Sequence, residues 1–194
     1  DLLSFLFSSV SDGPMIAGTS IYKDSLEKQV ASPLLSVHAR PTSDAIADKT
    51  FLTGDGYAAK DCTFLDRGVL KSYLLSLYGS RKTGKPRTLN DGDGIMVDAG
   101  NTAYANIVKG VKRGLLLARF SGGRPGNSGD FAGVAKNSYY IEDGEIKYPV
   151  SETMVSGNFA EMVKNITAVS SERVDFGYAI LPYVSVSGVT ISGK

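Results

Sequence analysis

At 194 residues, with an apolar fraction of 42% and a charged fraction of 21%, the chain has the size and composition of one ordinary globular domain. Its formal net charge of +1 lacks the basic excess with which nucleic-acid-binding proteins neutralise phosphates, so no direct contact with nucleic acid is expected. The single cysteine, Cys62, excludes an internal disulfide, and no apolar run approaches the roughly 18–20 residues that span a bilayer. We therefore expect a cytoplasmic protein without membrane contact.

The beginning of the chain, residues 1–7, is apolar but lacks the basic residues and the cleavage pattern of a signal peptide. It also has no initiating methionine, so we expect it to be the end of a helix within a longer protein. We divide the chain into a connecting segment, residues 1–49, which is expected to end a preceding N-terminal domain, and a β-rich domain, residues 50–194.

Two elements are expected in the connecting segment. Residues 24–30 are a short helix candidate, with Asp24 as its cap. Residues 34–40 are mostly apolar and are predicted to form a strand that Pro41 ends.

The next part of the chain is rich in glycine. Glycines break residues 50–68 into short predicted strands and turns. The apolar run over residues 69–77 is too short to decide between a helix and a strand. Residues 79–94, rich in Gly, Lys, Asp and Pro, are predicted to form a loop, and the basic side chains in it are expected to be solvated.

Two amphipathic helices are predicted further on. Residues 104–111 and 159–166 each carry apolar side chains at positions i, i+3, i+4 and i+7, which places those side chains on one helical face. Thr102 is the expected cap of the first helix, and Asn158 followed by Glu161 resembles a capping box at the start of the second. We expect both apolar faces to pack into the core.

Strands surround these helices. Residues 115–120 are predicted to form one buried strand, and residues 179–191 two short strands around Gly188. Residues 139–150 are predicted to form a hairpin, because the central Asp-Gly pair supplies positive φ angles at the turn. The expected fold class is α+β, with mostly antiparallel sheets and a few amphipathic helices; the sequence leaves closure into a barrel open.

The sequence contains no complete catalytic or metal site. Residues 79–85 match the opening of a phosphate-binding loop, but Pro86 stands where a Ser or Thr would bind magnesium. A zinc site needs three or four ligands, whereas the chain has one histidine, His38, and one cysteine, Cys62. We expect His38 to be a structural or surface residue and Cys62 an unreactive thiol. No catalytic and no metal-binding residue is therefore assigned.

One polar turn is the candidate binding site. Three polar residues and one glycine lead into a predicted strand that begins with a phenylalanine; the residues are Asn127, Ser128, Gly129, Asp130 and Phe131. Such a turn can present backbone donors at a cleft, although a tight turn closed by an Asx-type hydrogen bond has the same composition.

Four segments in order resemble the TldD/PmbA family, also called the modulator of DNA gyrase family. They are Asn127-Ser-Gly-Asp-Phe-Ala-Gly133, Ile141-Glu-Asp-Gly-Glu-Ile-Lys-Tyr-Pro-Val150, Val155-Ser-Gly-Asn-Phe-Ala-Glu-Met162 and Val189-Thr-Ile-Ser-Gly193. Upstream, Asp66-Arg-Gly-Val-Leu-Lys-Ser-Tyr-Leu74 is similar to another family segment. The resemblance covers the chain from about residue 50 onward and corresponds to the C-terminal part of the family.

Within the family the chain resembles PmbA, also called TldE, because residues 174–182 lack the zinc-binding cysteine of TldD-type members. The resemblance implies a non-catalytic subunit that pairs with a TldD-like, zinc-bearing relative, cleaves unfolded peptides with it and helps form the substrate cleft. Zinc is expected in the partner and no cofactor in this chain. The alternative is a homodimeric scaffold that binds a peptide or another ligand without cleaving it.

Overall fold

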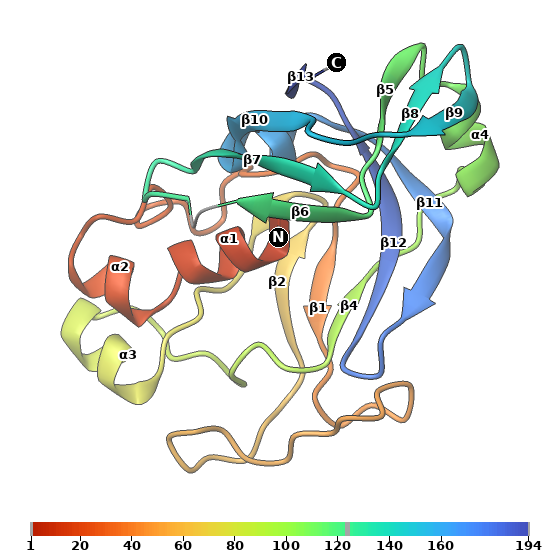
Figure 1. Ribbon diagram of the computed structural model, residues 1–194. Coiled ribbons are helices and arrows are strands. Elements are labelled where there is room, and N and C mark those ends of the chain that lie inside the picture. Colours follow the sequence, from red (N-terminus) through yellow and green to blue (C-terminus); the bar gives the residue numbers. More distant parts are fainter. Residues whose placement is uncertain (1, 123–124, 194) are drawn as a thin grey trace.

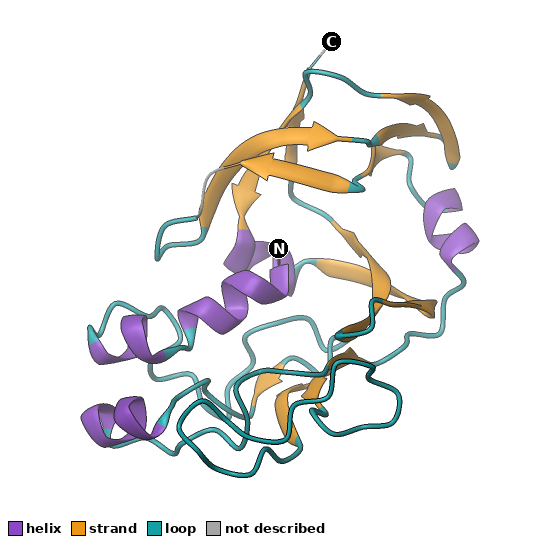
Figure 2. Cartoon of the chain, turned by 60° about the horizontal axis from the view of Figure 1, so that its bottom comes forward, coloured by secondary structure: helices purple, strands orange, loops and turns teal. Residues whose placement is uncertain are grey.

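The computed structural model describes residues 2–122 and 125–193 and has three β-sheets and five helices in this part of the chain (Figures 1 and 2). The helices are α1 (Leu2–Ser9), α2 (Asp12–Ile16), α3 (Leu77–Thr83), α4 (Tyr104–Lys109) and α5 (Phe159–Lys164). None of these described helices is long and apolar enough to cross a membrane.

The largest sheet has six strands in the order β11-β12-β4-β1-β2-β3. Its strands are β1 (Val37–Ala39), β2 (Cys62–Asp66), β3 (Val69–Leu70), β4 (Ile95–Val97), β11 (Ile166–Asp175) and β12 (Ala179–Val186). All neighbours are antiparallel except β4 and β12, which run parallel.

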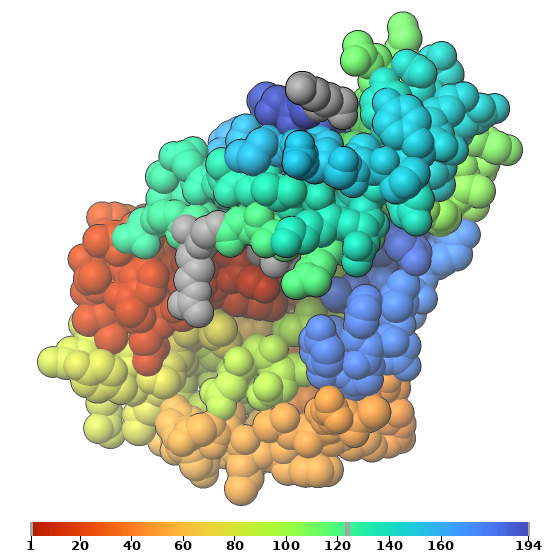
Figure 3. Space-filling model, in the orientation of Figure 1, coloured from red at the N-terminus to blue at the C-terminus, as the bar shows by residue number. Residues whose placement is uncertain are grey.

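Two smaller antiparallel sheets complete the fold. The four-stranded sheet has the order β13-β10-β7-β6, with β6 (Arg119–Gly122), β7 (Asp130–Lys136), β10 (Met154–Asn158) and β13 (Thr190–Ser192). The three-stranded sheet has the order β5-β8-β9, with β5 (Arg113–Leu116), β8 (Tyr139–Glu142) and β9 (Glu145–Pro149). Together with α4, this last sheet forms the projection at the upper right of Figure 3. The predicted α+β class with mostly antiparallel sheets is confirmed, and each sheet formed by the described strands is open.

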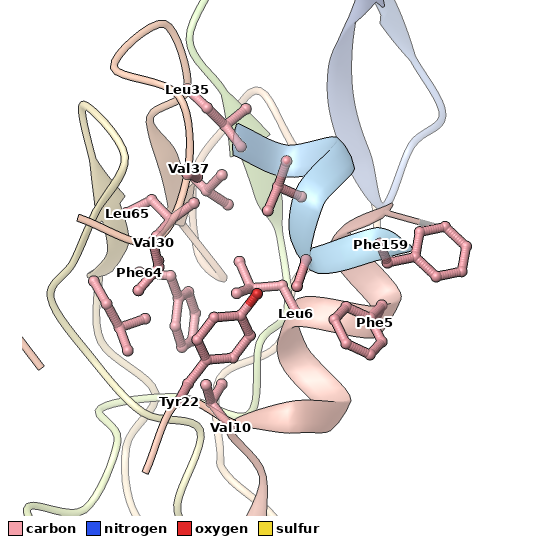
Figure 4. Packing of buried hydrophobic residues seen from close by; sticks show 14 of the residues in the cluster. Phe5, Leu6, Val10, Tyr22, Val30, Leu35, Val37, Phe64, Leu65 and Phe159 are labelled. Atoms are coloured by element: carbon pink, nitrogen blue, oxygen red, sulfur yellow. The ribbon is translucent and has the colours of Figure 1, made fainter. Parts of the chain in front are cut away.

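The main core lies between α1, α5 and the six-stranded sheet (Figure 4). Phe7 of α1 meets Phe64 of β2 with ring centroids 4.8 Å apart, and Phe5 stacks on Phe159 of α5 at 5.6 Å. Residues before position 50 thus share one core with residues after it. The expected division into segments 1–49 and 50–194 stays a prediction about domain organisation.

The helix predicted over residues 24–30 is wrong. The backbone there forms turns, because its polar groups pair with β3 instead of with one another. The amide of Glu27 donates to the carbonyl of Leu70 (2.8 Å), the amide of Leu70 donates to the carbonyl of Lys28 (3.0 Å), and Glu27 has a positive φ of 61°. Strand pairing over a long sequence separation outweighs the weak local helix propensity.

The loop predicted over residues 79–94 begins as a helix, α3. The Ser76 side chain accepts a hydrogen bond from the amide of Gly79 (3.2 Å), and Gly84 ends the helix with a left-handed φ of 70°. Both are ordinary helix-end signals, a serine N-cap and a glycine after the last turn. The loop prediction treats the glycines of this segment only as turn residues, whereas Gly84 ends a helix.

The predicted strand over residues 115–120 is divided between two sheets, because β5 pairs with β8 and β6 pairs with β7. At the break, the amide of Ala118 donates to Ser138 Oγ (3.2 Å) and Leu117 is 42% exposed, so the predicted continuous buried strand is wrong. The predicted hairpin is confirmed: Asp143 and Gly144 adopt φ angles of 49° and 78° between β8 and β9.

The two predicted amphipathic helices differ in outcome. In α5 the Asn158 side chain caps the helix, as predicted, and Phe159 and Val163 are buried. Helix α4 exists but has no buried residue, so its expected core face is wrong. The carboxylate of Glu172 on β11, rather than Thr102, accepts a hydrogen bond from the amide of Tyr104 at its start (2.8 Å).

Candidate functional site

The polar turn that precedes β7 is anchored to the start of α5. The Asp130 carboxylate accepts hydrogen bonds from Ser128 Oγ and from Asn158 Nδ2, each at 2.8 Å. Asn158 Nδ2 also donates to the carbonyl of Ser128 (2.9 Å), while its Oδ1 caps α5. The hydrogen bond from Asn158, and then that from Ser128, hold the pKa of Asp130 below its usual value. The turn is therefore closed by side chains rather than left free to rearrange.

The five candidate residues of this turn have different roles. Asn127, Ser128 and Asp130 are exposed and available to a ligand. Gly129 is buried with a φ of 90°, and Phe131 stacks on Phe159 with ring centroids 4.3 Å apart. Gly129 and Phe131 thus pack the turn against the core, and the exposed polar surface belongs to the other three residues.

Two neighbours of the turn, Asn158 and the segment of residues 21–30, were not among the candidate residues. Asn158 was predicted only as a helix cap, yet it bonds to both Ser128 and Asp130. Ser128 and Asn158 also lie on the rim of a cleft of about 360 Å³ whose other side is formed by residues 21–30. The sequence gives no signal for this approach of residues 21–30, because it depends on how the chain folds back over α5.

The segment that matches a phosphate-binding loop cannot form one in this conformation. Residues 79–83 lie inside α3, and the amide of Gly79 is occupied by Ser76 Oγ at the helix cap. A phosphate-binding loop needs these amides to point into a common cradle.

The sole histidine and the sole cysteine lie on opposite faces of the six-stranded sheet. His38 pairs with Thr63 and Ala39 pairs with Cys62, so Cys62 shares the buried face of Ala39 while His38 lies on the other. The His38 ring is hydrogen-bonded to Thr63 Oγ1 (2.9 Å) and lies 3.3 Å from the Asp98 carboxylate. Burial raises the pKa of the Cys62 thiol, which disfavours the thiolate that binds metals.

Zinc chemistry therefore does not fit the described part of this chain. Within residues 2–122 and 125–193, no group of three or more His, Cys, Asp or Glu side chains is arranged to hold a metal ion. The separation of His38 from Cys62 by the sheet removes the two strongest potential ligands from any common site.

The geometry defines an α+β domain with a polar turn at the rim of a cleft. Residues 1–193 match the model of a family described as "PmbA/TldA metallopeptidase C-terminal domain". The chain therefore belongs to the TldD/PmbA family, as the resemblance predicted, and corresponds to its C-terminal part.

Individual relatives agree with this assignment. The chain is 28% identical over 188 residues to the protein named Metalloprotease PmbA of Escherichia coli O157:H7, and this match covers 89% of the chain and 41% of that protein. It is 23% identical over 181 residues to the Zinc metalloprotease TldD homolog of Saccharolobus solfataricus, covering 87% of the chain and 40% of that protein.

A solved structure has the same fold. It belongs to a Bacteroides thetaiotaomicron protein described as a candidate modulator of DNA gyrase, with a TM-score of 0.89 and 25% identity. The match covers 100% of this chain and 44% of the other. The chain thus spans less than half the length of the relatives that it matches.

Proposed function

We propose that this chain is the C-terminal domain of a cytoplasmic PmbA-type subunit that does not itself hold the catalytic metal. In this proposal it pairs with a TldD-like, zinc-bearing relative, and the complex cleaves unfolded peptides. The turn of residues 127–131 contributes to the substrate cleft. Family membership supports the peptidase class, since relatives bear metalloprotease names.

The observation that carries the proposal is the exposed polar surface of Asn127, Ser128 and Asp130, of which Ser128 lines a cleft. The strand that follows the turn, β7, lies next to β6, and β6 is at the edge of its sheet in the described part of the chain. An extended peptide can pair its main chain with such an edge, which gives affinity with little sequence preference, as unfolded substrates require.

The division of labour between two subunits is supported by the positions of His38 and Cys62. Since the sheet separates them, the zinc ion and the water that it activates are assigned to the relative. The part of this domain is to hold the peptide in an extended form near that metal. No step at the metal is assigned to residues of this chain.

The experiment is peptide cleavage by the zinc-bearing relative, in the presence of zinc, with and without the full-length form of this protein. We expect cleavage only when both are present. Cleavage by the full-length protein alone would contradict the non-catalytic assignment. If the protein changes nothing in either setting but forms a dimer that binds the peptide, the alternative of a homodimeric scaffold is correct.

The turn is tested by Asp130→Ala in the full-length protein, which removes the acceptor for both Ser128 and Asn158. We expect weaker peptide binding and slower cleavage by the complex. The matched control is Asp175→Ala, which removes an exposed carboxylate that accepts from the amide of Gly177 (2.7 Å) in the turn between β11 and β12. If Asp130→Ala changes neither binding nor cleavage, the turn is not part of the cleft.

A further inference from the structure

Basic side chains gather on one face of α3, although the chain as a whole is almost neutral. Residues 67–90 contain six lysine and arginine side chains and no aspartate or glutamate. Tyr78, Arg81 and Lys82 stand at positions i, i+3 and i+4 of α3 and so share one helical face. All three are exposed, and the helix lies at the outer edge of the molecule, at the lower left of Figures 1 and 3. We call these three residues the α3 basic face.

The positive charge of this face is not neutralised by the carboxylates near it. An oxygen of Asp24 lies 3.7 Å from Lys85 Nζ, and one of Asp55 lies 3.3 Å from an Arg87 nitrogen, so these two basic residues are paired. Among residues 2–122 and 125–193, no carboxylate forms an ion pair with Arg81 or Lys82. Arg81 and Lys82 therefore remain as two adjacent exposed charges that an anionic ligand can reach.

Tyrosine rings hold the basic side chains in place. Lys82 Nζ lies 5.7 Å from the centre of the Tyr78 ring, and the Arg87 guanidinium carbon lies 4.0 Å from that of Tyr57. Tyr78 is 60% exposed, so most of its surface is available to a ligand. A cation held over an aromatic ring loses less conformational entropy when it binds, and tyrosine and arginine are both enriched at protein interfaces.

The size of the face selects among anionic ligands. A seven-residue helix is about 10 Å long, and the carboxylates of Asp24 and Asp55 lie beside it. A nucleic-acid duplex carries a negative charge about every 1.7 Å and would extend past the two free cations towards these carboxylates. Two neighbouring carboxylates on a short peptide match the two cations without that repulsion.

We propose that the α3 basic face binds a short acidic segment of an unfolded peptide. The inference rests on the proposed function only for the nature of the ligand, because the face does not include the turn of residues 127–131. It adds a preference for charge: acidic segments are held at α3 in addition to any contact that the peptide makes at the turn.

The probes are three fluorescein-labelled Gly-Ser repeat peptides with a central Glu-Glu, Gln-Gln or Lys-Lys pair. Binding to the full-length protein is measured by fluorescence anisotropy at low and at high salt. At low salt we expect the Glu peptide to bind about fivefold more tightly than the Gln peptide, as two exposed ion pairs allow, and the Lys peptide to bind most weakly. High salt should reduce these differences, because it screens exposed charges.

The test variant is Arg81→Gln/Lys82→Gln, which should remove the preference for the Glu peptide and leave binding of the Gln peptide unchanged. Its matched control is Lys109→Gln/Lys112→Gln, which removes two exposed cations at the end of another short helix, α4, and should keep the preference. Lys82→Gln alone is the milder variant should the double variant fail to fold, and it should reduce the preference to about twofold.

The outcomes separate this inference from the proposed function. Equal binding of the Glu and Gln peptides, or a preference that survives in the folded α3 variants, overturns the inference and leaves the proposed function standing. Tighter binding of a single-stranded DNA oligonucleotide through Arg81 and Lys82 also overturns it, because the face would then belong to nucleic acid. If none of the peptides binds the protein or its complex with the zinc-bearing relative, both are overturned.

Discussion

Two segments of this chain, residues 79–86 and 126–131, each contain two glycines and a serine but have different structures. The first forms most of α3 and the turn that ends it, whereas the second is a turn that leads into β7. The two segments differ in the residues outside them that fix their conformation. Ser76, just upstream, caps α3, whereas Asn158 on the neighbouring strand is hydrogen-bonded to the turn. Glycine content alone therefore does not distinguish a helix that ends in glycine from a binding turn.

Each segment depends on a carboxylate from an acidic side chain. Asp12 of α2 accepts hydrogen bonds from the amide and the hydroxyl of Ser76, at 3.0 and 2.5 Å, and is half-buried. Asp130 performs the same task for the turn but is exposed. The helix is thus fixed by a contact inside the fold, whereas the turn keeps its polar groups in solvent, as a surface that meets a ligand requires.

The largest effect is expected for Gly129→Val in the turn. At a φ of 90° a β-branched residue is strained, and its Cβ would lie 2.8 Å from Cζ of Phe5. Strain and overpacking together should lower the free energy of unfolding by about 3 kcal/mol or more, measured by urea denaturation. Gly126→Val is the control: only Ser128 Oγ, at 3.9 Å, is near its Cβ, so the loss should stay below about 1 kcal/mol. Equal losses would mean that the conformation at Gly129 does not hold the turn.

A double-mutant cycle tests how the first segment is fixed. The carboxylate of Asp12 occupies the space that a Cβ at Gly79 would need. Asp12→Ala should cost about 2 kcal/mol, because it removes both hydrogen bonds to Ser76. Gly79→Ala should destabilise the wild type, but in the Asp12→Ala background it should stabilise the protein by up to about 1 kcal/mol, as alanine does in an ordinary helix. Additive effects of the two substitutions would show that Asp12 does not exclude the side chain.

Local signals in the sequence predicted those elements whose hydrogen bonds are local. The hairpin of β8 and β9 follows from its Asp-Gly turn, and α5 follows from its apolar spacing and its Asn158 cap. The failures involve long-range partners: residues 24–30 pair with β3, and the predicted strand over residues 115–120 divides because its halves join different sheets. Nothing within those segments specifies their distant partners.

The candidate site shows the same limit. Its turn was predicted from Gly and polar residues in sequence, and the turn exists. The contribution of Asn158 and the cleft formed with residues 21–30 were missed, because they arise when segments more than 25 positions apart come together. Of the predicted residues, Gly129 and Phe131 are buried, so the sequence pattern also did not separate supporting residues from exposed ones.

The smallest stability effect at neutral pH, and one opposite in sign, is expected for Tyr22→Phe in the cleft beside the turn. Unlike Asp12 and Asp130, the buried Tyr22 hydroxyl has no hydrogen-bond partner in the described structure, so it has lost its hydration without compensation. Removing it while keeping the ring should raise the free energy of unfolding by about 1 kcal/mol at pH 7. A loss of stability would instead mean that the hydroxyl has a hydrogen-bond partner, such as a bound water.

Alkaline titration of the same variant gives an independent check. Burial, and then the charge of Glu161, raise the pKa of Tyr22 to about 12, whereas an unfolded tyrosine titrates near 10. Above about pH 10 the unfolded chain releases this proton and the folded chain keeps it, so stability falls as the pH rises towards 12. The wild type should lose roughly 2–3 kcal/mol more than Tyr22→Phe over this window, as two pKa units imply. Parallel pH profiles for the two proteins would mean that the Tyr22 hydroxyl is in contact with solvent rather than buried.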